Sequence, residues 1–268
     1  MAAVLAALAP SARAQLNKAT PEELQDISIT EKLDAHIPLD LEFVDDEGKP
    51  VKLSDYFDGK RPVILTLNYY RCPMLCGLML NGMVDALKRI SLEPDKDFEI
   101  VTGGFDPLEG PDLAAAKKKN YVNEYGRSTA VTGWHFLTGK RDPIRTLADT
   151  VGFKYKWNEA QQQWGHSASL IICTPDGHVS RYIGGVVFDP QTVRMSLIEA
   201  SEGKIGTLFD QVFLTCFQYH SDQGAYTASA IGFMRLGGGL TLIFLAGLVF
   251  ILWRRDVRRK KLAAAHSA

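Results

Sequence analysis

Two cysteines spaced four residues apart are the most reactive side chains in this sequence. Cys72 and Cys76 lie in the run NYYRCPMLC, after an apolar, β-prone stretch at residues 63–67 and before a predicted helix at residues 77–90. Residues four apart on a helix share one face, proline is tolerated at the first helical position, and a helix N-terminus favours the thiolate. The pattern predicts a reactive dithiol at the end of a strand; the alternative is two unrelated buried cysteines.

One histidine is a candidate third member of the site. His166 lies ninety positions after Cys76, immediately before a predicted buried strand. Two thiolates and one imidazole form a soft donor set that suits copper or zinc. A structural zinc site normally has a fourth protein ligand, and none accompanies these three in the sequence, which favours copper. Taken alone, His166 is also compatible with a solvated loop histidine.

The elements that position these residues alternate between strands and helices. Apolar, β-prone runs predict strands at residues 63–67, 98–105, 134–137, 153–157, 167–173 and 179–183. Amphipathic runs predict helices at residues 77–90, 112–125, 144–151 and 192–201. A β-hairpin is predicted before them at residues 39–44 and 50–53. The alternation predicts a layered α/β domain.

The C-terminal end predicts a membrane anchor. Residues 236–253 carry no charge, and a helix of that length spans about 27 Å, close to the ~30 Å hydrocarbon layer of a bilayer. The tail at residues 254–268 is rich in arginine and lysine, which places it in the cytoplasm by the positive-inside rule. The alternatives are a buried core helix and a nucleic-acid-binding tail.

The N-terminal end predicts export. A short apolar run and an Ala-Arg-Ala sequence of the small-x-small form occur within residues 1–14, which we interpret as a truncated signal peptide because the usual basic leader is absent. The chain is then expected in the bacterial inner (cytoplasmic) membrane with a single-pass anchor, its main domain in the periplasm. Such a compartment permits disulfides, so the dithiol can cycle there.

Composition and charge complete the domain prediction. The 268 residues are 46% hydrophobic, enough for one full core. Removing the six basic residues and one acidic residue of the tail from 30 basic and 31 acidic leaves 24 and 30, a net charge of −6 that gives no footprint for nucleic acid. Between the two ends we predict a linker at residues 15–35, an α/β domain at 36–205 and an aromatic-rich juxtamembrane segment at 206–235.

Together these motifs resemble the Sco/SenC family of copper proteins, which serve cytochrome c oxidase assembly. The resemblance covers about residues 36–203. It rests on YRCPMLC at residues 70–76, FDP at 105–107, LTG at 137–139, GHS at 165–167 and TPDG at 174–177. Each motif alone is weak, but the cysteine pair, the downstream histidine and the PDG turn are specific in combination.

The resemblance implies a thioredoxin-like fold that holds copper, as Cu(I), Cu(II) or both, on Cys72, Cys76 and His166. It gives Asp106, which matches an acidic position near the family's metal site, a supporting role. The implied function is a membrane-tethered periplasmic copper chaperone that assists assembly of the CuA centre of cytochrome c oxidase. Its implied partners are the oxidase subunit that carries CuA, a copper-donor chaperone and the membrane.

Two features depart from the family pattern. The predicted anchor is C-terminal, whereas the family's usual anchor is N-terminal. Cys216 and His220, four residues apart, lie in an additional segment; they form either an auxiliary copper-holding pair or a packed cysteine and an interfacial histidine. Cys173 falls in a predicted core strand, where we expect it to be inert, although pairing with Cys216 stays open because connectivity cannot be deduced from the sequence.

The competing function is that of an enzyme, a thiol–disulfide oxidoreductase acting on the oxidase subunit or other exported targets. Cys72 and Cys76 would then be a redox dithiol, one attacking and the other resolving, with no need for His166. Three residues separate the pair, instead of the two in Cys-x-x-Cys oxidoreductases, so their potentials do not transfer. A peroxidase relative is a weaker option, because Arg71 alone does not make a peroxidatic site.

Overall fold

The structure is a computed structural model. It describes residues 27–205, 217–220 and 225–228 and the single residues 241, 245 and 254. The chain divides into two units, Met1–Ile205 and Gly206–Ala268. The boundary falls where the sequence places the end of the α/β domain. In the second unit, strands β10 (Phe217–His220) and β11 (Ala225–Ala228) pair antiparallel.

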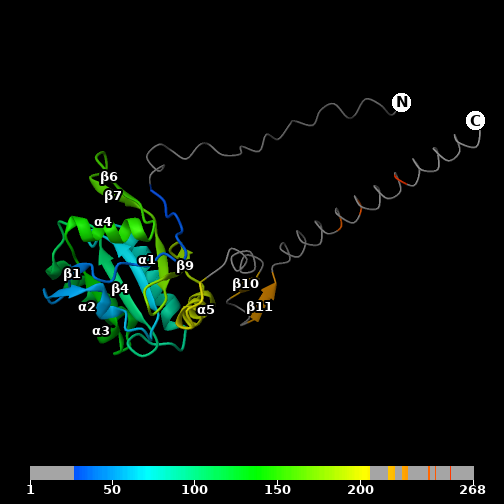
Figure 1. Ribbon diagram of the computed structural model, residues 1–268. Helices are drawn as coiled ribbons and strands as arrows, with labels where there is room; N and C mark the ends of the chain where they lie inside the picture. Colours follow the sequence, from blue (N-terminus) through cyan, green and yellow to red (C-terminus); the bar gives the residue numbers. More distant parts are fainter. Residues whose placement is uncertain are drawn as a thin grey trace, which may run out of the picture. The chain divides into compact units, whose positions relative to one another are not determined.

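The first unit alternates strands and helices along the chain (Figure 1). Its strands are β1 (Glu42–Val44), β2 (Pro50–Lys52), β3 (Val63–Asn68), β4 (Glu99–Gly104), β5 (Trp134–Leu137), β6 (Tyr155–Asn158), β7 (Gln163–His166), β8 (Ser169–Cys173) and β9 (Val179–Gly184). Its helices are η2 (Leu53–Tyr56), α1 (Leu75–Lys88), α2 (Pro111–Tyr125), α3 (Ala130–Gly133), α4 (Arg141–Thr150) and α5 (Pro190–Ser201). The predicted α/β class is confirmed.

Five strands form the central sheet in the order β5-β4-β3-β8-β9. Strands β3, β4 and β5 run parallel, whereas β8 is antiparallel to β3 and β9 to β8. Every residue of β3, β4 and β8 is buried, as expected for near-continuous apolar runs covered on both faces. At the position of the predicted hairpin, β1 pairs antiparallel with β2.

Each face of the sheet has its own apolar core. Because side chains alternate along a strand, Ile64 packs among residues of α1, α2 and α5, and the adjacent Leu65 packs with residues of α4 and η2. The parallel strands β3 and β4 both end at the same edge of the sheet. The loops after these two strands therefore start close together.

The segment before the sheet belongs to the domain, so the predicted linker at residues 15–35 is wrong for its described part. Ile29 forms a bridge with Phe153, and the Thr30 N–H donates to the Gly152 carbonyl at 2.9 Å. Gly152 follows α4 with φ 65°, where a Cβ would meet the Thr30 carbonyl at 1.9 Å. Apolar side chains such as Ile37, fully buried, hold this extended segment against the sheet.

The chain ends fall largely outside the described residues. Within the described part, no helix is long and apolar enough to cross a bilayer. The anchor predicted at residues 236–253 is described only at residues 241 and 245, and the predicted signal peptide at residues 1–14 is outside the description.

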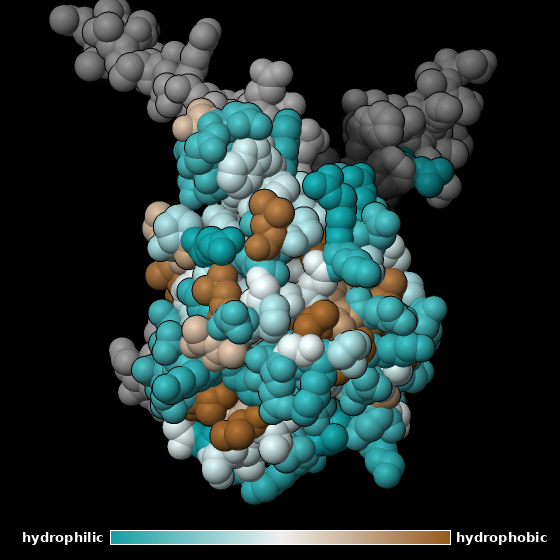
Figure 2. All heavy atoms as spheres, turned by 90° about the vertical axis from the view of Figure 1, so that its left-hand side faces the viewer, coloured by the Kyte–Doolittle hydropathy of each residue, from teal (hydrophilic) through white to brown (hydrophobic). Residues whose placement is uncertain are grey.

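The described surface carries few large apolar side chains. On the face drawn in Figure 2, they form small, separate patches within a mostly hydrophilic surface. Three exposed ones belong to the cysteine motif, to the start of α1 and to the loop after β4: Met74, Leu78 and Leu108.

Candidate metal centre

The cysteine motif is a tight turn followed by a helix. The Cys72 N–H donates to the Tyr69 carbonyl at 3.1 Å, and α1 begins only at Leu75 with Met74 as its N-cap. Proline at the first helical position is therefore a wrong prediction, because Pro73 precedes the helix. The sulfurs meet because the turn folds Cys72 back over the helix N-terminus, where its Sγ accepts the Cys76 N–H at 3.3 Å.

A buried acid that the sequence analysis missed fixes this turn. Glu109, 5% exposed, accepts the backbone N–H groups of Tyr70 at 2.6 Å and Arg71 at 2.7 Å, one on each carboxylate oxygen. Burial raises the pKa of Glu109, and the two N–H donors oppose that shift. The sequence gives only a faint signal for this role. The N–H groups of an irregular turn need acceptors, and Glu109 is an acid that closely follows the FDP motif.

His166 reaches the cysteines from a second hairpin. It ends β7, which pairs antiparallel with β6, and Tyr155 is its direct partner. The sequence predicts a single edge strand at residues 153–157 and gives no signal for β7, because Gln-Trp-Gly-His lacks an apolar run. The His166 Nδ1–H donates to the Ser167 carbonyl at 2.8 Å. This bond leaves Nε2 as the free lone pair, the form in which histidine binds metals.

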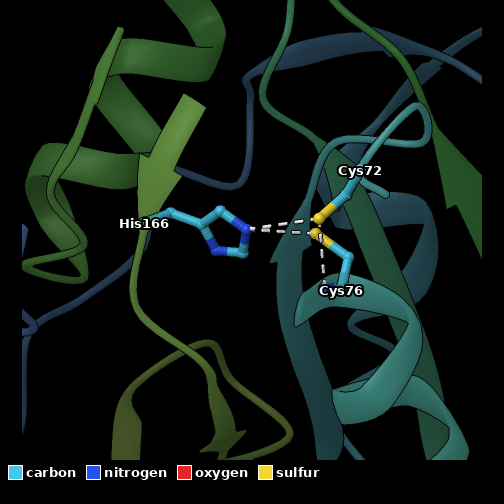
Figure 3. Close-up of side chains that lie close together, drawn as sticks. All are labelled: Cys72, Cys76 and His166. Carbon is cyan, nitrogen blue, oxygen red and sulfur yellow. Dashed lines mark hydrogen bonds between the residues drawn. The ribbon is translucent and has the colours of Figure 1, made fainter. Parts of the chain in front are cut away.

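The three predicted ligands converge (Figure 3). His166 Nε2 lies 3.3 Å from Cys76 Sγ and 3.9 Å from Cys72 Sγ. The three donor atoms all lie within 4.8 Å of one another, and among the described residues this is the one group of three or more cysteine, histidine or acidic residues so arranged. Cys76 and His166 are buried and Cys72 is half-buried. One small ion would bring all three atoms into coordination distance with modest side-chain shifts.

The two thiols differ in acidity. Hydrogen bonds from the Cys76 thiol and then from the Cys76 and Met74 backbone lower the pKa of Cys72 to about 3, against the opposing effect of burial. Burial, followed by the neighbouring Cys72 sulfur, raises the pKa of Cys76. Metal-free protein therefore holds one thiolate and one thiol. A bound cation would offset the repulsion that keeps the second proton in place.

A family model described as SCO1/SenC matches residues 30–200. The chain belongs to the SCO1/SenC family. No curated protein was found to match the sequence. The resemblance inferred from the cysteine motif, the histidine and the PDG turn is thereby confirmed.

Solved structures share the fold of this SCO1/SenC chain. A candidate electron transfer protein from Aquifex aeolicus VF5 is 21% identical, with 65% of this chain and 96% of that chain covered and a TM-score of 0.57. BsSco, a member of the Sco family of cytochrome c oxidase assembly proteins, is 25% identical, with 65% and 98% covered and a TM-score of 0.51. Arabidopsis thaliana ScoI with copper bound is 19% identical, with 61% and 96% covered and a TM-score of 0.47. The α/β fold with a central sheet matches the thioredoxin-like Sco structures.

Two other residues singled out from the sequence lie apart from the donor group. Asp106 is buried in the loop after β4, where its carboxylate accepts the Leu108 N–H at 3.0 Å; its supporting role stays a prediction. Cys173 is fully buried in β8 with its pKa raised by burial. Cys216 lies outside the described residues, and only the backbone of His220 is described, in β10.

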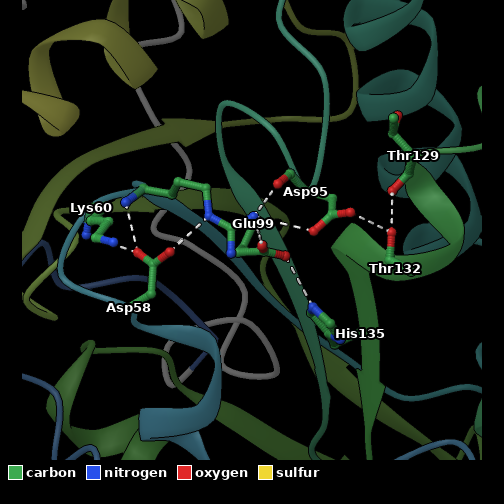
Figure 4. Close-up of polar contacts among 8 residues, drawn as sticks. Asp58, Lys60, Asp95, Glu99, Thr129, Thr132 and His135 are labelled. Carbon is green, nitrogen blue, oxygen red and sulfur yellow. Dashed lines mark hydrogen bonds and ion pairs between the residues drawn. The ribbon is translucent and has the colours of Figure 1, made fainter.

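A second cluster of ionisable groups, arranged around one buried carboxylate, lies at the opposite end of β4 (Figure 4). Glu99, at the start of β4, is 2.5 Å from Arg61 and 3.0 Å from His135 Nε2. Arg61 also pairs with Asp58 at 2.8 Å. His135, expected from the sequence on the surface or in a loop, instead lies in β5 with the Tyr56 ring 4.3 Å away. The buried Glu99 carboxylate thus has a partner for each of its two oxygens.

Proposed function

We propose that this SCO1/SenC protein is a membrane-tethered copper chaperone of the bacterial periplasm that assists assembly of the CuA centre of cytochrome c oxidase. The observation that carries the proposal is the convergence of Cys72, Cys76 and His166 in one buried group. Copper is the cargo of this site. The oxidase subunit that accepts it and a chaperone that supplies it are the proposed partners.

The donor chemistry supports copper over zinc. Thiolates select Cu(I), and imidazole suits both copper oxidation states. A structural zinc site is closed by four protein ligands, whereas the described residues add no fourth cysteine, histidine or acid to this group. The low pKa of Cys72 provides one thiolate before the metal arrives. Three ligands leave the ion open to an incoming donor, as transfer requires.

The test is Cu(I) loading of the full chain in detergent, with a coloured chelator as competitor. Wild type should bind about one ion, and His166→Ala should bind it more weakly by at least about tenfold, because a ligand is lost. His135→Ala is the matched control, since it removes a histidine of the central sheet that lies outside the donor group. Wild-type stoichiometry near zero, or equal affinities for wild type and His166→Ala, would contradict the proposal.

Thiol–disulfide reduction is the second candidate, favoured by the contrast in acidity between the two thiols. Cys72 thiolate would attack a target disulfide and release one target thiolate; Cys76, losing its proton, would then attack Cys72 Sγ and release the second. The solved structure of BsSco is described as revealing a disulfide switch. Reduction of oxidised oxidase subunit that survives His166→Ala but not Cys76→Ser would favour this role.

The tether and the compartment are part of the same proposal. The uncharged segment at residues 236–253 followed by the basic tail supports a single span with the tail in the cytoplasm. A membrane-impermeant maleimide added to intact spheroplasts should then label Cys72. Labelling that requires lysis would place the domain on the other side and contradict this topology.

A further inference from the structure

A groove with a volume of about 450 Å³ runs between helix α4 and the β6–β7 hairpin. Figure 1 shows these two elements side by side at one end of the first unit. Of the residues on these two elements, His166 at the end of β7 belongs to the donor group. Its lining includes four basic residues and two tryptophans: Arg141, Arg145, Lys154, Lys156, Trp157 and Trp164.

The groove is strongly basic. Its lining contains two arginines and two lysines against the single acid Asp149, which is 3.6 Å from Arg145 in a solvent-exposed pair. The surrounding chain is acidic, with a net charge of −6 once the C-terminal tail is removed. A basic concavity on an acidic molecule attracts carboxylates and orients their approach.

The hairpin wall adds two aromatic side chains. Trp157 and Trp164 are cross-strand partners with ring centroids 5.2 Å apart, and Trp157 is exposed. Trp164 is half-buried beside it. Tryptophan and arginine together are the residues that dominate protein–protein binding energies.

The groove lies next to the metal centre. Tyr155 lines it and is the strand partner of His166. The Phe105 ring lies 4.7 Å from the Tyr155 ring and 5.3 Å from the His166 ring. A molecule seated in the groove is therefore one aromatic layer away from the copper-ligating imidazole.

We propose that this groove docks an acidic segment of the protein that exchanges copper with the Cys72, Cys76 and His166 site. The inference rests on the proposed chaperone function and names the surface chemistry of its partner. Carboxylates of the segment pair with Arg141 and Lys154, and the rings of Trp157 and Trp164 supply apolar contacts. A concave, tryptophan-lined basic wall fits a protein segment better than a flat anionic lipid surface, which is the competing occupant.

The test uses metal-free full chain in detergent micelles and fluorescent hexaglutamate as the probe. Arg141→Glu combined with Lys154→Glu reverses two groove charges, and the new acid at the first position of α4 suits that helix end. Lys60→Glu combined with Lys119→Glu is the control, an equal change of charge at exposed sites outside the groove. The basic tail is identical in all three proteins, so differences in affinity report the mutated sites.

Hexaglutamate should bind the groove variant at least about tenfold more weakly than wild type, because like charges now face each other. The control should stay within about twofold, and the probe should slow amide exchange in α4 and β6. Equal weakening in both variants, or no binding to wild type, overturns the docking site. So does groove-dependent binding of phosphatidylglycerol vesicles with no groove-dependent binding of the peptide.

Copper loading separates this inference from the function beneath it. All three proteins should bind Cu(I) with the same stoichiometry, because neither pair of mutations touches the donor group. Loss of peptide binding with intact copper loading, as expected for the groove variant, assigns the groove to docking. Failure of wild type to load copper overturns the chaperone function and the docking role together.

Discussion

The two ends of the central sheet hold polar clusters that differ in how their buried groups are paired. At the start of β4, the buried carboxylate of Glu99 is shared between Arg61 and His135. At the opposite end, Cys72 and Cys76 face His166 with one thiolate already formed. The buried carboxylate of the first cluster already has its partners, whereas the thiolate of the second gains from a positive ion.

The difference separates a structural cluster from a functional one. A buried charge is tolerated when paired and hydrogen-bonded, which the Glu99 cluster achieves with its own side chains. The cysteine site instead keeps one sulfur half-exposed and leaves the His166 Nε2 lone pair directed at the sulfurs. The paired Glu99 carboxylate is therefore expected to contribute to stability, whereas the cysteine site is expected to bind an ion.

Removing one sulfur from the cysteine site should have the largest effect on Cu(I) affinity. Cys76→Ala is expected to lower Cu(I) affinity by more than about a hundredfold, because changes outside the direct ligands already cost 10–100-fold. Competition with a coloured Cu(I) chelator measures this. Cys173→Ala is the matched control, the same chemical change at a fully buried cysteine in β8. Similar copper affinities for the two variants would show that the converging donors do not bind the ion.

Removing the charge of Glu99 should lower the stability of the fold and leave Cu(I) binding unchanged. Glu99→Gln takes the carboxylate away from Arg61 and His135. We expect a loss of roughly 2–3 kcal/mol in the free energy of unfolding, below the full cost of breaking a buried pair because Arg61 and His135 keep partial solvent contact. Urea unfolding of metal-free protein measures it. A reduced Cu(I) stoichiometry in folded Glu99→Gln would contradict the division between the two ends.

The same contrast explains what could be predicted from the sequence. Apolar runs predicted the strands of the sheet, and β5 has the bounds predicted, because burial on both faces leaves a strong local signal. The spacing of Cys72 and Cys76 predicted that their sulfurs meet, and they do, even though the helix begins after Pro73. β7 and Glu109 were missed, since a polar hairpin strand and an acceptor for two turn N–H groups become visible only when distant segments meet.

The pH dependence of Cys72 sharpens the electrostatic side of the comparison. With a pKa of about 3, Cys72 should react with iodoacetamide at a nearly constant rate from about pH 5 to about pH 8, unlike a thiol of pKa ~8.5. Its folded pKa is depressed, so the stability that this thiolate contributes is full above the unfolded pKa. That contribution falls as the pH drops towards 3.

Cys76→Ala tests the cause of the low pKa. The hydrogen bond from the Cys76 thiol is the largest favourable contribution to the Cys72 thiolate, so its removal should raise the pKa of Cys72 and make alkylation increase with pH. Mass spectrometry of the labelled peptide follows the rate. A profile that stays flat in Cys76→Ala would assign the low pKa of Cys72 to the backbone donors instead.

The smallest expected effect on Cu(I) affinity comes from Glu109, the acid that holds the turn next to Cys72. Glu109 uses both carboxylate oxygens to hold the Tyr70 and Arg71 N–H groups. Glu109→Gln keeps one acceptor and turns an NH₂ towards the other N–H, which should cost about 1–2 kcal/mol in unfolding free energy. Because the loosened turn carries Cys72, Cu(I) affinity should fall severalfold with unchanged stoichiometry. Glu124→Gln, an exposed site on α2, is the control. An unchanged copper affinity with the expected loss of stability would limit the role of Glu109 to folding. A loss of both stability and copper affinity would show that the turn, and not the donor set alone, determines how tightly the ion is held.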